Sequence, residues 1–250
     1  MQKKSIYNVL LSGIFILIPF TMSSQTWTQM DTNIEGVESY CNFGYAIALS
    51  EDGYTIISGG NALDHNEEDS GYTQVFEWNG SSWQQKGESL YGEEFEDEFG
   101  YSADISADGN TIAIGATQGG SETQVGYVKV FSWNGSSWEM KGSRLNGENE
   151  GDHYGTSLSL SNDGNTLAVY DRQGINGESA GTVVVYNWNG TDWTQKGDHL
   201  EGNEGDNFGW ALSLSADGNT LAVGAESGYS FHGYAAIYFW NGSEWEQKGN

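Results

Sequence analysis

Short apolar runs separated by tight turns fill most of this sequence. In one stretch of the chain the runs cover residues 99–106, 111–116, 126–133 and 137–145. An Asp-Gly pair stands between the first two runs and an Asn-Gly pair between the last two. Such pairs are typical of tight hairpins, because Asn, Asp and Gly tolerate the positive φ that these turns need. The runs lack a clean alternation of polar and apolar residues, which predicts a four-stranded antiparallel sheet covered on both faces.

The same pattern recurs four times, at a period of about 55 residues. Every copy carries an aromatic-Gly pair, an Asp-Gly turn, a Trp-Asn-Gly triplet and a Lys-Gly pair in the same register. The aromatic-Gly pairs begin at Phe43, Phe99, Tyr154 and Phe208, and the Lys-Gly pairs at Lys86, Lys141, Lys196 and Lys248. Repeated sheets of this kind predict an all-β fold, a β-propeller of four-stranded antiparallel blades.

We expect repeat boundaries near residues 43–98, 99–153, 154–207 and 208–250. The segment Trp27–Met30 aligns with the start of a fourth strand, and the sequence stops on another fourth strand, Trp245 onward. This pattern predicts four visible blades of a longer array that is incomplete at its C-terminus.

The tryptophans follow the repeat with one exception. Each Trp-Asn-Gly-x-x-Trp hairpin places two indoles on one sheet face, near each other across the turn, as Trp78 and Trp83 illustrate. Packing explains these pairs better than an aromatic platform for sugar rings. Trp210 follows Phe208-Gly209 and has no Trp counterpart in the other copies, so we take it as a candidate ligand-binding residue.

The repeat resembles a known family. An aromatic-Gly pair, a strand and then Asp-Gly-Asn-Thr-(Leu/Ile)-Ala-(Val/Ile)-Gly-Ala, clearest in residues 99–116 and 208–225, resembles the FG-GAP repeat of integrin α-subunit propellers and of many exported bacterial surface proteins. The resemblance implies a propeller at a cell surface. The family's Pro after Gly-Ala is absent, and so is the calcium loop between the first two strands, so the family's metal site does not carry over.

The first residues have the order of a secretory signal peptide. Lys3 and Lys4 precede an apolar run from Ile6 to Phe20, and small polar residues follow. A run of about 15 residues is shorter than the roughly 20 that a spanning helix needs, which argues against a membrane anchor. We therefore expect a signal peptide at residues 1–25, propeller repeats at 26–250, no membrane span in the mature chain, and a secreted or cell-surface location.

The net charge of the chain excludes some classes of binding partner. The chain has 35 Asp and Glu against 9 Lys and Arg, a formal net charge of -26. Such a chain repels nucleic acid and anionic lipid. The single cysteine, Cys41, cannot form an internal disulfide, and we expect it to be a buried apolar residue rather than a reactive thiol.

Because the four strands of a blade are antiparallel, alternate connections lie at opposite ends of the blade, so the loops form two faces. The tight Asp-Gly and Asn-Gly turns share one end of the blades, whereas the loops that vary in length and the acidic loops between blades share the other. The second face carries more than half of the 35 acidic residues, and function tends to lie on variable loops held by a rigid scaffold. It is our candidate binding surface. We expect its partner to be an extracellular protein or glycan that is cationic or reached through bridging cations.

Three acids recur two residues before an aromatic-Gly pair: Asp97, Asp152 and Asp206. One explanation is that each accepts backbone N–H bonds in a tight turn, as Asp commonly does. The alternative is a Ca²⁺ site formed by these three residues with help from Glu93 and Glu148. We expect no required cofactor, and Ca²⁺ remains the one metal that this loop pattern suggests.

No catalytic motif is present: the chain has no Gly-x-Ser-x-Gly elbow, phosphate loop or His-Glu-x-x-His helix. The acids recur with the repeat, whereas a catalytic pair should be a local departure from it, so we assign no catalytic residue. The sequence favours an exported, non-catalytic binding or adhesion module with an acidic variable face. The alternatives are a substrate-recognition propeller domain of a larger secreted enzyme and a purely structural surface protein.

Overall fold

The computed structural model describes residues 27–65, 67–117, 125–149, 151–172, 180–226 and 232–249. It divides into two units, Met1–Thr32 and Asn33–Asn250, and the strands of the described residues all lie in the second. The expected signal peptide at residues 1–25 lies outside the described residues. Within the described ranges, no helix has the length and hydropathy needed to cross a membrane.

The expected strand at Trp27–Met30 is wrong, because residues 27–32 form no strand. In the repeats this strand is one arm of a hairpin, in which Trp83 pairs with Trp78 across the Asn-Gly turn. No Trp-Asn-Gly triplet precedes Trp27 in the sequence, so the other arm of that hairpin is missing.

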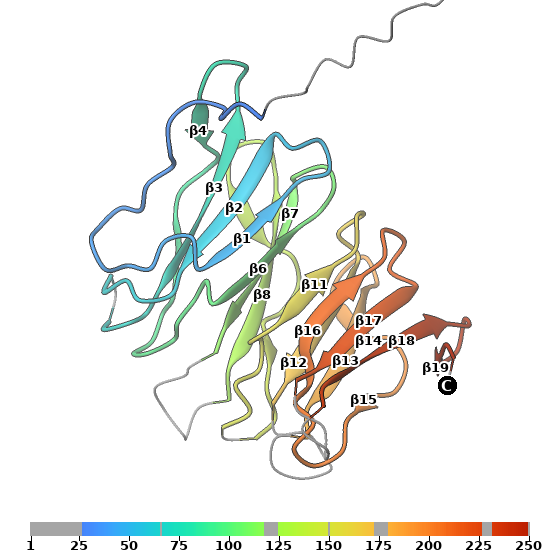
Figure 1. Cartoon of the computed structure of the whole chain (residues 1–250). Coiled ribbons are helices and arrows are strands. Elements are labelled where there is room, and N and C mark those ends of the chain that lie inside the picture. The colour runs from blue at the N-terminus through green and yellow to red at the C-terminus, as the bar shows by residue number, and fades with distance from the viewer. Residues whose placement is uncertain are drawn as a thin grey trace, which may run out of the picture. The chain divides into compact units, whose positions relative to one another are not determined.

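The second unit consists of four antiparallel sheets in chain order, which we call blades 1 to 4 (Figure 1). Blade 1 contains β1 (Ala46–Leu49), β2 (Thr55–Gly60), β3 (Tyr72–Trp78), β4 (Trp83–Gln85) and β5 (Leu90–Tyr91). Blade 2 contains β6 (Ser102–Ile105), β7 (Thr111–Ala116), β8 (Tyr127–Trp133), β9 (Trp138–Met140) and β10 (Leu145–Asn146). Blade 3 contains β11 (Leu158–Leu160), β12 (Thr166–Asp171), β13 (Thr182–Trp188), β14 (Trp193–Gln195) and β15 (Leu200–Glu201). Blade 4 contains β16 (Phe208–Leu214), β17 (Thr220–Ala225), β18 (Tyr234–Trp240) and β19 (Trp245–Gln247).

The predicted all-β fold with repeated antiparallel sheets is confirmed, but two strand predictions need correction. The run 137–145 is split into β9 and β10, which both pair with β8, because Gly142 between them adopts a φ of 83° that a strand cannot accommodate. The run 99–106 is shortened to β6, and Gly100, with a φ of 96°, lies in the turn before it.

The hairpin turns are closed by their own side chains. In blade 2 the Ser106 hydroxyl donates to Asp108 Oδ1 at 2.6 Å and accepts from the Thr111 amide at 2.9 Å. In the Asn-Gly hairpin, Asn134 Oδ1 accepts from the amides of Ser136 and Ser137 at 2.8 and 2.9 Å. These local bonds explain why the Asp-Gly and Asn-Gly marks recur with their serines.

Apolar residues fill each interface between blades. We call the face of a blade that meets the following blade its forward face, and the opposite one its rear face. At the first interface, Ile57 and Val75 on the forward face of blade 1 pack with Ile105 and Ile112 on the rear face of blade 2. The equivalent positions pack in the same way at the next two interfaces. Burial on both faces accounts for the continuous apolar runs in the sequence.

A lysine joins each blade to the next, in an arrangement that we call the lysine latch. Lys141 follows β9 of blade 2. Its Nζ donates to Gly164 O at 2.7 Å and to Asn165 Oδ1 at 2.9 Å, both in the Asp-Gly turn of blade 3. The same ammonium lies 5.4 and 5.6 Å from the ring centroids of Trp188 and Trp193. In return, the indole Nε1 of Trp193 donates to the backbone carbonyl of Lys141 at 2.7 Å. Lys86 and Lys196 make the same set of contacts with blades 2 and 4.

Replacing Lys141 by Met keeps a long side chain but removes the charge, its hydrogen bonds and its attraction to the indoles. We expect the free energy of unfolding, measured by urea denaturation, to fall by about 2 kcal/mol. Gln84→Met, at an exposed position on β4, is the control and should change stability by less than about 0.5 kcal/mol. Equal losses in the two variants would contradict a specific role for the latch.

A second contact between blades uses a half-buried carboxylate. Asp104 Oδ2 in blade 2 accepts from the Leu160 amide of blade 3 at 2.7 Å. One repeat later, the Ser159 hydroxyl accepts from the Leu214 amide of blade 4 at 3.0 Å. Burial raises the pKa of Asp104, although hydrogen bonds from Leu160 and Ile105 oppose the shift. In the turn of blade 3, burial alone would raise the pKa of Asp163. Hydrogen bonds from Ser161 and Asn165 outweigh burial, so the pKa of that carboxyl is lowered.

These two pKa shifts predict opposite pH dependence. A raised folded-state pKa contributes stability below the unfolded value of about 3.9 that is lost as pH rises through the folded value, and a lowered pKa does the reverse. The stability of the wild type relative to Asp104→Asn should therefore grow as pH falls from about 7 to 3. Relative to Asp163→Asn it should shrink over the same range. Denaturant unfolding at several pH values measures both slopes, and slopes of the same sign would overturn the assignment.

Candidate functional site

A tight turn opens each blade at the variable face. Its aromatic residue is an anchor, since Phe99 is 0 % exposed and Tyr154 2 %. In blade 2 the Tyr101 amide donates to Glu98 O at 3.0 Å, and the glycine inside the turn supplies the positive φ. Glu98 and His153, which precede the anchors, adopt φ values of 52° and 48°. Asn42 and Asn207 adopt φ values of 54° and 48° at the equivalent positions of blades 1 and 4, so the left-handed conformation belongs to the repeated turn. Asn and His tolerate it better than Glu does.

The three recurring aspartates lie beneath these turns. Asp97, Asp152 and Asp206 are 0, 0 and 2 % exposed. Asp97 Oδ2 accepts from the amides of Glu93 and Glu94 at 2.7 and 3.0 Å and from the Tyr127 hydroxyl at 2.7 Å. Asp152 and Asp206 accept backbone amides of their own loops in the same way. The interpretation of these residues as acceptors in tight turns is confirmed.

The two glutamates suggested as helpers of a metal site lie apart from these carboxylate contacts. The Glu93 side chain pairs with Lys129 Nζ at 2.8 Å. Glu148 lines a small hollow of about 70 Å³ together with Tyr154, Tyr186 and other residues of blade 3. In the part of the chain that the structure describes, no cluster of three or more His, Cys, Asp or Glu side chains is arranged to hold a metal ion. Calcium binding by these loops stays a prediction.

Cys41 is 4 % exposed, and its thiol lies 3.0 Å from the Glu38 carbonyl and 3.3 Å from the Tyr72 hydroxyl. It packs with Leu63 and Tyr72 in a small apolar cluster. The expected buried role of this residue is confirmed.

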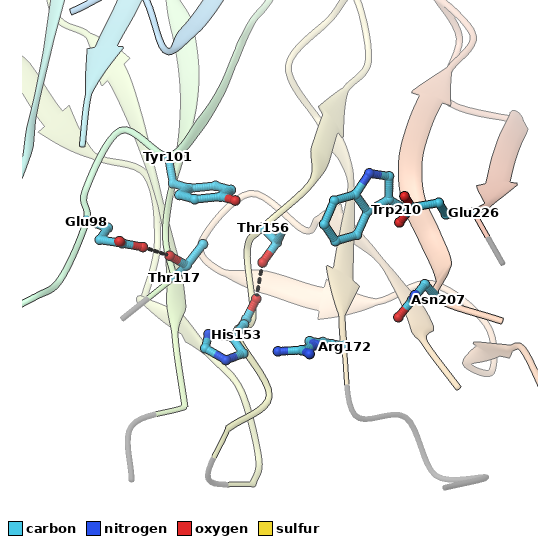
Figure 2. A pocket seen from close by; sticks show the side chains of 9 residues that line it. All are labelled: Glu98, Tyr101, Thr117, His153, Thr156, Arg172, Asn207, Trp210 and Glu226. Carbon is cyan, nitrogen blue, oxygen red and sulfur yellow. Dashed lines mark hydrogen bonds between the residues drawn. The ribbon is translucent and has the colours of Figure 1, made fainter. Parts of the chain in front are cut away.

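A pocket of about 470 Å³ lies at the variable face where blades 2, 3 and 4 meet. Its lining has a simple rule: each blade contributes the residue before its aromatic-Gly pair, the residue after that pair, and the residue that follows its second strand. Figure 2 shows the blade 2 group on one side, the blade 4 group on the other and the blade 3 group between them. The groups are Glu98, Tyr101 and Thr117; Asn207, Trp210 and Glu226; and His153, Thr156 and Arg172.

The pocket combines both charges with aromatic surface. Glu98 is held by a hydrogen bond from the Thr117 hydroxyl, and Arg172 is fixed by its amide, which donates to the carbonyl of buried Asp152 at 2.8 Å. Trp210 is 46 % exposed and meets Tyr170 edge to face, with ring centroids 6.4 Å apart. Such an arrangement leaves indole surface for a ligand.

Tyr101 supplies a hydroxyl that stays neutral. Burial, and then its hydrogen bond with Tyr45, raise the pKa of Tyr101 well above its usual value. The two rings pack with centroids 4.9 Å apart. The Tyr101 hydroxyl can therefore both donate and accept hydrogen bonds across the physiological pH range.

Sequence reasoning singled out Trp210 and the face on which this pocket lies but did not single out the other eight lining residues. It followed the acids that recur, whereas the pocket is lined by positions where the repeats differ. At the position before the aromatic, blades 2 to 4 carry Glu98, His153 and Asn207. Three positions of the repeat therefore vary among these blades while the rest of the repeat is regular, and this variation could have indicated the pocket residues from the sequence.

The comparisons with known proteins bear on the fold. No family model matches the chain, and no curated protein matches it. Among solved structures it is similar to a protein from Bacteroides uniformis described as a "putative 6-phosphogluconolactonase", with 14 % identity, a TM-score of 0.54, and 81 % of this chain and 52 % of that one covered. Weaker likenesses are to Kuenenia stuttgartiensis hydrazine synthase (TM-score 0.49, 14 % identity, 77 % and 49 % covered) and to TolB from Acinetobacter baumannii (TM-score 0.48, 12 % identity, 81 % and 42 % covered).

The chain thus spans about half the length of the first of these structures. At such identities the likeness shows the fold alone. Together with the four antiparallel sheets, it identifies the architecture as that of β-propeller blades.

Asp97 and Glu93 provide a test of the division between buried and exposed acids. Asp97→Ala leaves two backbone amides and the buried Tyr127 hydroxyl without their acceptor, so we expect the free energy of unfolding to fall by about 3 kcal/mol. Glu93→Ala removes the exposed partner of the buried Lys129 ammonium. Because Lys129 keeps its contacts with the Phe99 and Tyr127 rings, we expect a smaller loss of about 1 kcal/mol. Urea denaturation measures both. A small loss for Asp97→Ala would show that this aspartate is not a structural acceptor and would favour a ligand-binding role.

Proposed function

We propose that this protein is an exported, non-catalytic binding module of FG-GAP-like repeats and that its ligand occupies the pocket where blades 2, 3 and 4 meet. The observation that carries the proposal is the lining rule. The latch lysines, tryptophan pairs and Asp-Gly turns are the same from blade to blade, whereas the three pocket positions differ among blades 2, 3 and 4, which line the pocket. Framework positions that repeat and pocket positions that differ are expected of a rigid scaffold that presents a binding site.

The pocket chemistry favours a glycan. The indole of Trp210 offers an apolar face against which the C–H face of a sugar ring can pack. Glu98 and Glu226 can accept hydrogen bonds from sugar hydroxyls, and Arg172 can donate to ring or hydroxyl oxygens. A volume of about 470 Å³ lies in the range of small-molecule pockets and suits one or two sugar rings rather than a protein segment.

The acidic loops around the pocket favour partners with positive charge or with bridging cations. Glu93, Glu94 and Glu96 belong to the loop that leads to Glu98. Attraction between this surface and a cationic glycan or protein would be screened by salt, so binding should weaken as ionic strength rises.

A glycan array followed by calorimetry on the strongest ligand tests the proposal. Trp210→Ala and Arg172→Ala should each weaken binding about tenfold or more, because each removes a central contact of the pocket. Matched controls are Tyr40→Ala, which removes another exposed aromatic, and Arg144→Ala, which removes the arginine stacked on Tyr127. Both controls should retain binding and all four variants should remain folded.

Two results would contradict the proposal. No saturable ligand on glycan or matrix-protein arrays would favour a structural surface protein. Turnover would also overturn a non-catalytic role, and hydrolysis of 6-phosphogluconolactone, suggested by the name of the similar Bacteroides protein, is the assay to include. We expect no turnover of that lactone.

A further inference from the structure

Blade 3 departs from the repeat on its rear face, at the first position of its third strand. The other three blades carry a tyrosine at this position: Tyr72, Tyr127 and Tyr234. In blade 2 the Tyr127 hydroxyl donates to the buried Asp97 at 2.7 Å. Blade 3 carries Thr182 instead, and Thr182 lines the hollow of about 70 Å³ that Glu148 also lines. This cavity, the blade 3 hollow, thus opens where a tyrosine side chain stands in the other blades.

The exchange of tyrosine for threonine leaves two buried polar atoms without a hydrogen-bond partner among the residues that the structure describes, Thr182 Oγ1 and Asp152 Oδ1. Thr182 is 2 % exposed and Asp152 is 0 % exposed. Asp152 is the counterpart of Asp97, so the two atoms belong to the positions at which a tyrosine meets its acceptor in blade 2. Buried polar groups are nearly always paired. Their state here indicates that a hydrogen-bonding molecule from outside occupies the hollow.

Blade 2 fills the equivalent space with its own cations. Lys129 Nζ lies 2.8 Å from Glu93 Oε1, and it is 5.8 and 5.2 Å from the ring centroids of Phe99 and Tyr127. The Arg144 guanidinium lies 4.6 Å from the centroid of the same tyrosine ring. The chain itself therefore shows which chemistry suits this position of a blade: an ammonium group held by a carboxylate and an aromatic ring, beside a hydroxyl donor.

Blade 3 keeps the acceptors of this arrangement and lacks its cations. Glu148 and Tyr154 stand at the positions of the blade 2 glutamate and phenylalanine, and both line the hollow. Val184 replaces the lysine and His199 replaces the arginine, and these two residues line it as well. Asp171, where the other blades carry Gly or Ala, adds a second carboxylate to the lining.

The tyrosines of the hollow report a negative potential. Burial raises the pKa of Tyr154 well above its usual value, and its neighbour Tyr186 and the charges of Asp171 and Glu148 add to the shift. Burial also raises the pKa of Tyr186, and the same two carboxylates act in the same direction, whereas the hydrogen bond from Tyr154 opposes them. An environment that disfavours a phenolate favours a cation.

We propose that the blade 3 hollow binds a small amino alcohol, whose ammonium group pairs with Glu148 beside the Tyr154 ring and whose hydroxyl bonds to Thr182. Such a ligand supplies the two groups that Lys129 and Tyr127 supply in blade 2. A cavity of about 70 Å³ has room for about five water molecules, which suits a molecule of the size of ethanolamine. The hollow shares no lining residue with the pocket of about 470 Å³, so this site is independent of the proposed glycan site.

Isothermal titration calorimetry of the purified protein with ethanolamine tests the proposal. Ethylene glycol is the matched neutral probe, and we expect it to bind at least about tenfold more weakly, because it lacks the ammonium group. Glu148→Gln, at an exposed position, should weaken ethanolamine binding at least about fivefold, since it removes the carboxylate partner. Glu244→Gln, an exposed glutamate in the hairpin between β18 and β19, is the control and should bind ethanolamine as the wild type does.

Two further variants restore the side chains that blade 2 carries, Val184→Lys and Thr182→Tyr. Each should fill the hollow and abolish ethanolamine binding while keeping the wild-type circular dichroism spectrum. The proposal is overturned if ethanolamine shows no saturable binding, which would leave the hollow to water. It is also overturned if ethylene glycol binds equally well, if Glu148→Gln binds ethanolamine as the wild type does, or if both restored variants still bind it, since the amine would then bind elsewhere.

Discussion

The lysine latch is the contact on which the rest of the array depends. A single ammonium touches both the tryptophan hairpin and the Asp-Gly turn of the following blade. Burial lowers the pKa of Lys141, and the nearby carboxylates of Asp163 and Asp108 oppose that shift. A partly buried cation is tolerable only where its hydrogen bonds and its aromatic walls are in place. The lysine, the tryptophan pair and the turn therefore form one unit, which explains why all of these marks recur in fixed register.

The latch fixes the hairpin end of the blades and leaves the other end free to differ. Below each opening turn, a buried aspartate and a buried aromatic residue hold the backbone, as Asp97 and Phe99 do in blade 2. Side chains on either side of the aromatic-Gly pair then line the pocket, and those of Tyr101 and Trp210 also pack against Tyr45 and Tyr170. Three neighbouring blades bring three such sets together around one pocket. Asn42 and Asn207 share the positive φ of Glu98 and His153 at the equivalent positions, so the backbone of this turn belongs to the repeated framework, and only the side chains that blades 2 to 4 present there differ.

The sequence was sufficient for features that depend on neighbours along the chain. Hairpin turns at Asp108-Gly109 and Asn134-Gly135, the pairing of Trp133 with Trp138, and the acceptor role of Asp97 all follow from local chemistry and are present. The latch was not predicted, because Lys141 meets Gly164 and Trp188 only after two blades pack. The pocket escaped prediction for the same reason: Glu98, Arg172 and Trp210 come from three blades, and only their tertiary arrangement makes them neighbours.

The pocket differs in charge from the acidic surface around it. Acidic residues surround the site, but the pocket itself contains Arg172 and His153 beside Glu98 and Glu226. Recognition would then depend on shape and hydrogen bonding, with the surrounding charge acting at longer range. The most direct test is a crystal structure of the protein with its strongest array ligand. We predict a sugar ring against Trp210 within hydrogen-bonding distance of Arg172, and a ligand bound at any other surface would contradict the account.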